Sequence, residues 1–184
     1  MGNYFESIAQ VNPEPFNTIT IGFNYSENVN ETDFHNYWYI EPAFEGYIAV
    51  PFYLGNIQTG IRYNYFPIKE ANLPYFYGLL FYMQWENEFK LASFLSYSIG
   101  ARAGLYSMNF DENEIIADKH LLEESELAIG IVTKLSLKIY AGWALNLTAD
   151  YNSIFTSKRI NLAFVGAGIS KTFSSPNWLR DFLK

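Results

Sequence analysis

The chain has 184 residues, of which 19% are aromatic and 17% are charged, and its formal net charge is −7. So many aromatic side chains argue against disorder, and the absence of cysteine excludes a disulfide scaffold. The acidic balance argues against a nucleic-acid partner, because phosphate groups would be repelled.

Apolar residues recur at every second position, which is typical of β-strands. In chain order the sequence predicts eight strands, at 17–25, 38–51, 57–66, 75–85, 89–107, 123–134, 136–152 and 159–173. Tight turns are predicted near Leu54–Asn56, Glu86–Glu88 and Thr133–Leu135, and they alternate with longer connections. The long connections therefore share one end of an up-and-down meander. Such a meander removes its exposed edges by closing into a barrel.

The segment from Leu135 to Tyr151 shows how the two faces differ. One parity is wholly apolar, which suits a surface in hydrocarbon, and the other is small or polar, which suits a narrow barrel interior. We therefore predict an all-β, eight-stranded antiparallel transmembrane barrel with its apolar face outward. A soluble ligand-binding barrel is the alternative. Aromatic residues near strand ends are expected at the membrane interfaces: Trp38, Tyr65, Tyr75, Trp85 and Phe173.

The inward parity also carries charged residues. Four are acidic and four are basic: Glu41, Glu45, Arg62, Lys90, Arg102, Glu126, Lys138 and Asp150. Buried charges are costly unless they are paired, so we expect a closed, hydrogen-bonded interior network. The functional alternative is the selectivity filter of a small-solute pore.

The last strand does not keep one apolar parity. Leu162 and Phe164 share one face, whereas Val165 and Ile169 share the other. A β-bulge near Ala163 would reconcile the two halves of the strand.

Ser175 and Pro176 can begin a short amphipathic helix. Its apolar face would anchor the tail to the membrane interface or to a partner protein, through Trp178, Leu179, Phe182 and Leu183. A disordered end is the alternative. The chain then divides into an N-terminal segment (1–16), the barrel (17–173) and the tail (174–184).

Chemistry would have to come from the loops or the barrel mouth. His35 and His120 both fall in long loops on the same side, with Asp33 and Ser125 nearby, but without hydrolase spacing. The acidic loop 109–126 lacks the pattern of an EF-hand. We predict no catalytic residue, no metal site and no cofactor. A lipid-modifying enzyme that acylates or deacylates lipid A remains the alternative.

No segment is long and apolar enough for a membrane-spanning helix, and Met1–Val11 does not read as a secretory signal. We expect either a cytosolic chain or a mature form from which a targeting segment has been removed.

The stretch from Gly166 to Phe173 carries glycines and ends in an aromatic residue. It resembles the closing strand of small eight-stranded outer-membrane barrels of the OmpA/OmpX type, and 41–47 with 63–66 is similar to barrels of the Bacteroidota. The resemblance implies a removed signal peptide, periplasmic termini and extracellular long loops. The two-faced strands, the closed lumen and the lack of a catalytic cluster in the sequence favour a structural, adhesive or complex-subunit role, with outer-membrane lipid and other envelope proteins as partners.

Overall fold

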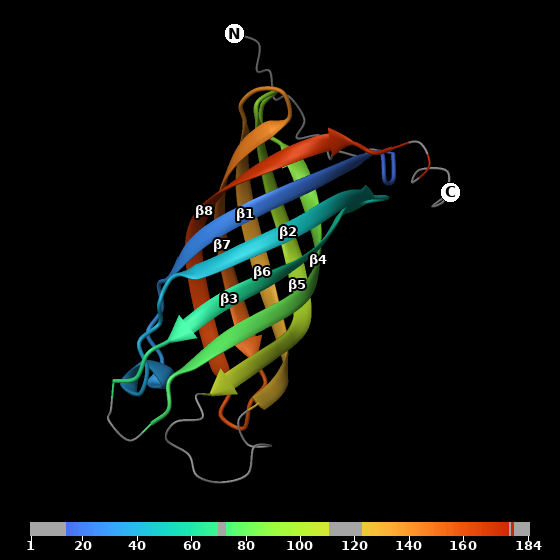
Figure 1. The fold of residues 1–184 in the computed structure, drawn as a ribbon. Helices are drawn as coiled ribbons and strands as arrows, with labels where there is room; N and C mark the ends of the chain where they lie inside the picture. Colours follow the sequence, from blue (N-terminus) through green and yellow to red (C-terminus); the bar gives the residue numbers. More distant parts are fainter. Residues whose placement is uncertain (1–13, 70–72, 111–122, 177, 179–184) are drawn as a thin grey trace.

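The computed structural model describes residues 14–69, 73–110, 123–176 and 178, which form a closed antiparallel barrel of eight strands (Figure 1). Its strands are β1 (Thr18–Asn28), β2 (Ala43–Phe52), β3 (Gly55–Phe66), β4 (Phe76–Lys90), β5 (Leu95–Phe110), β6 (Glu123–Lys138), β7 (Trp143–Ile154) and β8 (Ile160–Ser174). Each strand pairs with the next along the chain, and β8 pairs with β1, so the sheet has no free edge. The predicted up-and-down barrel is confirmed.

The connections sort to the two ends of the barrel, as the sequence predicts (Figure 1). The short ones, 53–54, 91–94 and 139–142, lie at the end where β1 begins and β8 finishes; we call this the turn end. The connections after β1, β3, β5 and β7 leave from the opposite end, which we call the loop end, and a 3-10 helix, η1 (Asp33–Asn36), lies in the first of them. No helix among the described residues is long and apolar enough to cross a membrane.

Two of the predicted tight turns are misplaced. The structure has them at 91–94 and 139–142 instead of Glu86–Glu88 and Thr133–Leu135. Leu137 pairs with Leu145 across the second of these turns, and paired residues face the same side of a sheet. Because the two numbers differ by an even amount, the alternation runs unbroken through the hairpin and conceals it. Ala141 and Gly142 make the turn, with φ angles of 49° and 81°, in the left-handed region that glycine adopts readily.

The apolar face points out of the barrel. Leu137, Trp143 and Leu145 are 40%, 44% and 47% exposed, whereas Asn146 is only 2% exposed. The predicted outward direction of the apolar parity is therefore confirmed. Similar outward side chains occur on every strand, among them Ile21, Phe23, Phe44, Ile61, Phe81, Met83, Ile99, Leu105, Ile131, Leu147, Val165 and Ile169.

The loop end of the interior is filled by an apolar cluster. Phe66 and Phe76 stack there with ring centroids 4.5 Å apart. Trp38 stacks on Phe34 at 4.9 Å and donates a hydrogen bond from Nε1 to the Pro74 carbonyl at 3.0 Å. The sequence predicts Trp38 at the membrane interface, but the structure places it in the loop before β2, where it packs against the interior cluster.

The predicted bulge in β8 is wrong. The pairing of β8 with β7 runs without interruption from Ile160 to Lys171 and includes Ala163 opposite Tyr151. The pairing of β8 with β1 is also continuous, from Phe164 opposite Asn28 to Ser174 opposite Thr18. Leu162 and Phe164 point inward and are buried in the apolar cluster. The inward face of β8 is thus apolar near the loop end and small or polar toward the turn end, so two apolar parities meet without a bulge.

Inward tyrosines pack over glycines of the neighbouring strand. A Cβ atom at Gly22 would lie 2.2 Å from the Tyr47 ring, and one at Gly78 would lie 2.0 Å from Tyr106 Oη. These glycines leave room for aromatic rings that fill the narrow interior. Tyr82 lies over Gly60 in the same way.

Gly78→Ala is expected to lower the free energy of unfolding by about 1–3 kcal/mol, because Tyr106 must leave its position to make room. Gly46→Ala is the matched control, since Gly46 points outward and a Cβ there meets no atom within 4 Å. Urea titration of the protein refolded in vesicles measures both. Equal effects of the two substitutions would contradict the packing argument.

Candidate functional site

The middle of the interior holds an ion network that joins β2, β3, β5 and β7. Arg62 donates two parallel hydrogen bonds to Asp150, Nη1 to Oδ1 and Nη2 to Oδ2, both at 2.7 Å. It also donates from Nε to Glu45 Oε2 at 3.0 Å, and Arg102 Nη1 lies 3.0 Å from the same oxygen. All four side chains are at least 96% buried. Because β3 and β7 are not neighbours in the sheet, the bond between Arg62 and Asp150 crosses the lumen.

Neutral side chains form further hydrogen bonds with the ion network. Asn24 Nδ2 donates to Glu45 Oε1 at 3.0 Å, and Arg102 Nε donates to Gln84 Oε1 at 3.0 Å. The Arg102 guanidinium lies 3.9 Å from the centre of the Tyr82 ring, which adds a cation–π contact. Charge-assisted bonds of this kind offset the cost of removing ions from water.

A second ion pair lies on the turn side of this network. Lys134 Nζ is 2.6 Å from Glu86 Oε1, and Gln84 Nε2 donates to Glu86 Oε2 at 2.9 Å. Both charged residues lie where the sequence predicts turns, so they are absent from the predicted network; the continued parity of β4 and β6 is the signal that identifies them as inward residues. Among the described residues, the interior network comprises three acids and three bases: Glu45, Glu86, Asp150, Arg62, Arg102 and Lys134.

Four of the predicted network residues lie elsewhere. Glu41 is exposed and precedes β2, and Glu126 is half-buried toward the loop end of β6. Lys90 and Lys138 have the inward parity but are exposed, because they end β4 and β6 at the turn end. Parity gives the direction of a side chain and not its depth along the barrel.

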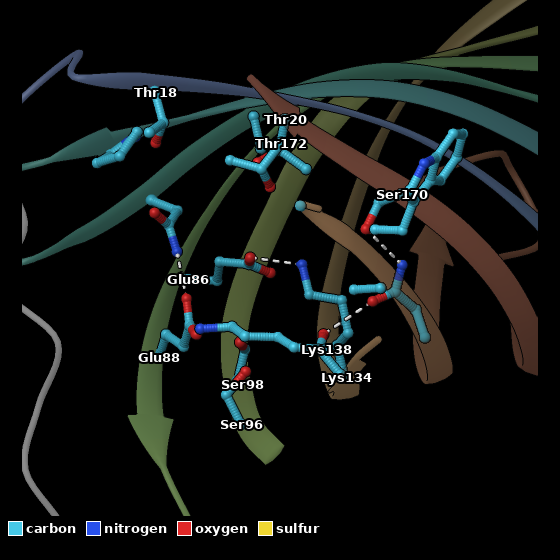
Figure 2. Close-up of a pocket in the computed structure, with 18 of the residues that line it drawn as sticks. Thr18, Thr20, Glu86, Glu88, Ser96, Ser98, Lys134, Lys138, Ser170 and Thr172 are labelled. Carbon is cyan, nitrogen blue, oxygen red and sulfur yellow. Dashed lines mark hydrogen bonds and ion pairs between the residues drawn. The ribbon is translucent and has the colours of Figure 1, made fainter. Parts of the chain in front are cut away.

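The interior opens toward the turn end into a cavity of about 520 Å³ (Figure 2). We call it the turn-end cavity. Its walls carry hydroxyl groups and charges, including Thr18, Thr20, Ser96, Ser98, Ser136, Ser170, Thr172, Glu86, Glu88, Lys90, Lys134 and Lys138. The void among the network residues, by contrast, is only about 10 Å³, roughly the space of one water molecule. The network therefore closes the inner end of the cavity.

His35 holds the first loop together through both ring nitrogens. Nδ1 accepts a hydrogen bond from the Thr32 backbone N–H at 3.0 Å. The proton of the neutral ring is therefore on Nε2, which donates a hydrogen bond to Asn28 Oδ1 at 2.9 Å. His120 lies outside the described residues. Within the described ranges, no group of three or more histidine, aspartate or glutamate side chains could hold a metal ion.

The other predicted interface residues lie toward the two ends of the barrel. Tyr65 and Tyr75 pack together at the loop end with ring centroids 5.9 Å apart, and Trp85 and Phe173 are each 47% exposed toward the turn end. Trp178 is 69% exposed.

The rest of the predicted tail anchor falls outside the described residues: Leu179, Phe182 and Leu183. The short C-terminal helix predicted there is not supported by the structure.

A closed barrel, an outward apolar surface and a filled interior together define the fold of the small outer-membrane β-barrels. Neisserial surface protein A is similar, with a TM-score of 0.58 and 14% identity over 84% of this chain and 97% of that one. The N-terminal barrel of Pseudomonas aeruginosa OprF is similar with a TM-score of 0.53 and 10% identity, over 87% of this chain and 100% of that one. Yersinia pestis Ail, solved in complex with the heparin analogue sucrose octasulfate, is similar with a TM-score of 0.53 and 10% identity, over 85% of this chain and 98% of that one.

At these identities the likeness establishes a shared fold. No protein-family model matches the chain, and neither does any curated protein. The similarity to barrels of the Bacteroidota stays a prediction.

Proposed function

We propose that this chain is an integral outer-membrane barrel with a closed lumen. It serves as a membrane-anchored scaffold for its loops, in a structural, adhesive or complex-subunit role. The turn end and both termini face the periplasm, and the loop end faces outward. Outer-membrane lipid covers the apolar belt, and other envelope proteins are the partners of the loops or the tail.

The outward surface supports a membrane location. Ile131 and Leu147, on adjacent strands, are 63% and 60% exposed, and Met83 on β4 is 63% exposed. A soluble monomer rarely exposes a continuous apolar patch of more than a few hundred Å². A belt that runs around all the strands is instead the outer surface of a transmembrane barrel.

The ion network is the observation that carries the closed lumen. Arg62 reaches Asp150 across the interior with two bonds of 2.7 Å, and Glu45 joins both arginines. A selectivity filter built from charged side chains instead uses a ring of charges of one sign. Here the buried charges balance and the apolar cluster covers the loop end, so both features oppose ion passage.

The closed lumen predicts no channel activity. Purified protein refolded in detergent is expected to migrate differently on a denaturing gel before and after boiling, because the closed sheet resists the detergent until heated. In planar bilayers the same material is expected to give no reproducible conductance steps. Identical migration of the two samples would contradict the folded barrel. Regular steps from heat-modifiable protein would contradict the closed lumen alone.

A further inference from the structure

Two exposed lysines at the turn end lack the ion pairing of the buried interior charges. Each buried charge of the network contacts an opposite charge, whereas Lys90 and Lys138 form no ion pair or side-chain hydrogen bond with any described residue. Both line the turn-end cavity. Its other lysine, Lys134, is neutralised by Glu86 at 2.6 Å. One further carboxylate, Glu88, leaves the cavity walls with more positive than negative charge.

The strand register brings the two lysines to one wall of the cavity. Lys90 is opposite Ser96 on β5, Ser96 is opposite Ser136 on β6, and Lys138 follows two residues later on the same face. Neighbouring strands are about 4.8 Å apart, so the backbones of Lys90 and Ser136 are separated by roughly 10 Å. Two long, flexible lysine stems can bring their ammonium groups to one anion across that span.

Two serine hydroxyl groups on β5 lie between the two lysine-bearing strands and are open to the cavity. Ser96 and Ser98 are 2% and 3% exposed, face the cavity and form no side-chain hydrogen bond with a described residue. Figure 2 shows both in the cavity wall, together with Glu88 and Lys138. Each hydroxyl group can donate one hydrogen bond and accept two, so both offer partners to a hydroxyl-bearing ligand in the cavity.

We propose that the turn-end cavity binds a small anion, a carboxylate or phosphate group carried on a hydroxyl-bearing body such as a sugar. Lys90 and Lys138 contact the anionic group, because they line the cavity and form no ion pair with any described residue. Ser96, Ser98 and the Glu88 carboxylate take the hydroxyl groups of the body. A volume of about 520 Å³ lies within the range of small-ligand sites.

Isothermal titration of the full chain, folded in a non-ionic detergent, tests this site. The probes are glucose 6-phosphate, glucuronate, glucose and inorganic phosphate. We expect one or both of the sugar anions to bind saturably, and glucose and inorganic phosphate to bind about tenfold more weakly or less. The stronger of the two sugar anions then identifies phosphate or carboxylate as the preferred group. No saturable binding of either sugar anion up to about 10 mM, or equal binding of glucose, would overturn the proposal.

Variants assign the binding to the cavity. The double substitution Lys90→Gln and Lys138→Gln is expected to weaken the sugar anion about tenfold or more, since two charge-assisted bonds are lost. Lys158→Gln, an exposed change at the loop end, is the matched control and is expected to leave binding unchanged. Equal weakening by both, or none by the double variant, would overturn the assignment. Heat-modifiable migration on a gel confirms that each variant is folded.

Discussion

Arg62→Met is expected to lower the free energy of unfolding by about 3–5 kcal/mol. The substitution removes the partner that gives two bonds to Asp150 and contacts Glu45, and both carboxylates stay buried. A buried carboxylate without its cation loses the interaction that offset its desolvation. Equilibrium unfolding in urea, followed by tryptophan fluorescence of the protein in vesicles, measures the change.

A double variant separates the cost of leaving a buried charge without its partner from the cost of lost packing. Arg62→Met combined with Asp150→Asn removes one acid and one base, and it leaves the contact between Arg102 and Glu45 in place. The double variant is expected to recover much of the lost stability, since removing both members of a buried pair is often nearly neutral.

Lys138→Met, at an unpaired and exposed position, is expected to change stability by less than about 0.5 kcal/mol. If Arg62→Met falls within that small range too, the network contributes nothing to the fold.

The same network shows where sequence reasoning ends. The period of two predicts that Glu45, Arg62, Arg102 and Asp150 point inward, because strand geometry fixes side-chain direction. It does not give the partner, since Arg62 and Asp150 are 88 residues apart on strands that meet only across the lumen. Depth along the barrel is equally hidden from the pattern.

The apolar pattern also does not reveal where the turns lie, for a related reason. Phe89 pairs with Tyr97 across the 91–94 turn, and their numbers again differ by an even amount, so the apolar parity passes through the turn unchanged. The polar residues Glu86–Glu88 are therefore predicted as the turn, although they lie in β4. Glu86 is an inward strand residue. The lumen is polar at that depth, and the Glu86 carboxylate forms an ion pair with Lys134 there.

At the loop end, some apolar residues that the sequence predicts to face outward point inward instead. There the interior is apolar, so Leu162 points inward while looking like an outward residue, and Trp38 packs inside for the same reason. The rule that apolar residues face lipid holds only where the lumen is polar. The change of apolar parity in the last strand was the available signal of an apolar interior layer, although a bulge explained it equally well.

Ile131→Arg tests the membrane itself. Ile131 is 63% exposed near the middle of β6, where it pairs with Ala101 and Tyr151. In a bilayer the substitution is expected to cost about 2–4 kcal/mol of unfolding free energy, because the guanidinium must enter the hydrocarbon core. Reversible unfolding of vesicle-inserted protein measures this cost.

Leu137→Arg is the matched control, because Leu137 lies on the same outward face one residue before β6 ends. Near the interface an arginine costs only about 0–1 kcal/mol, since its long side chain reaches the headgroups. A soluble barrel would have water at both positions, and both substitutions would then be nearly neutral. The difference between them therefore depends on the bilayer. Equal and small costs would mean that water covers the apolar belt, and the outer-membrane proposal would be wrong.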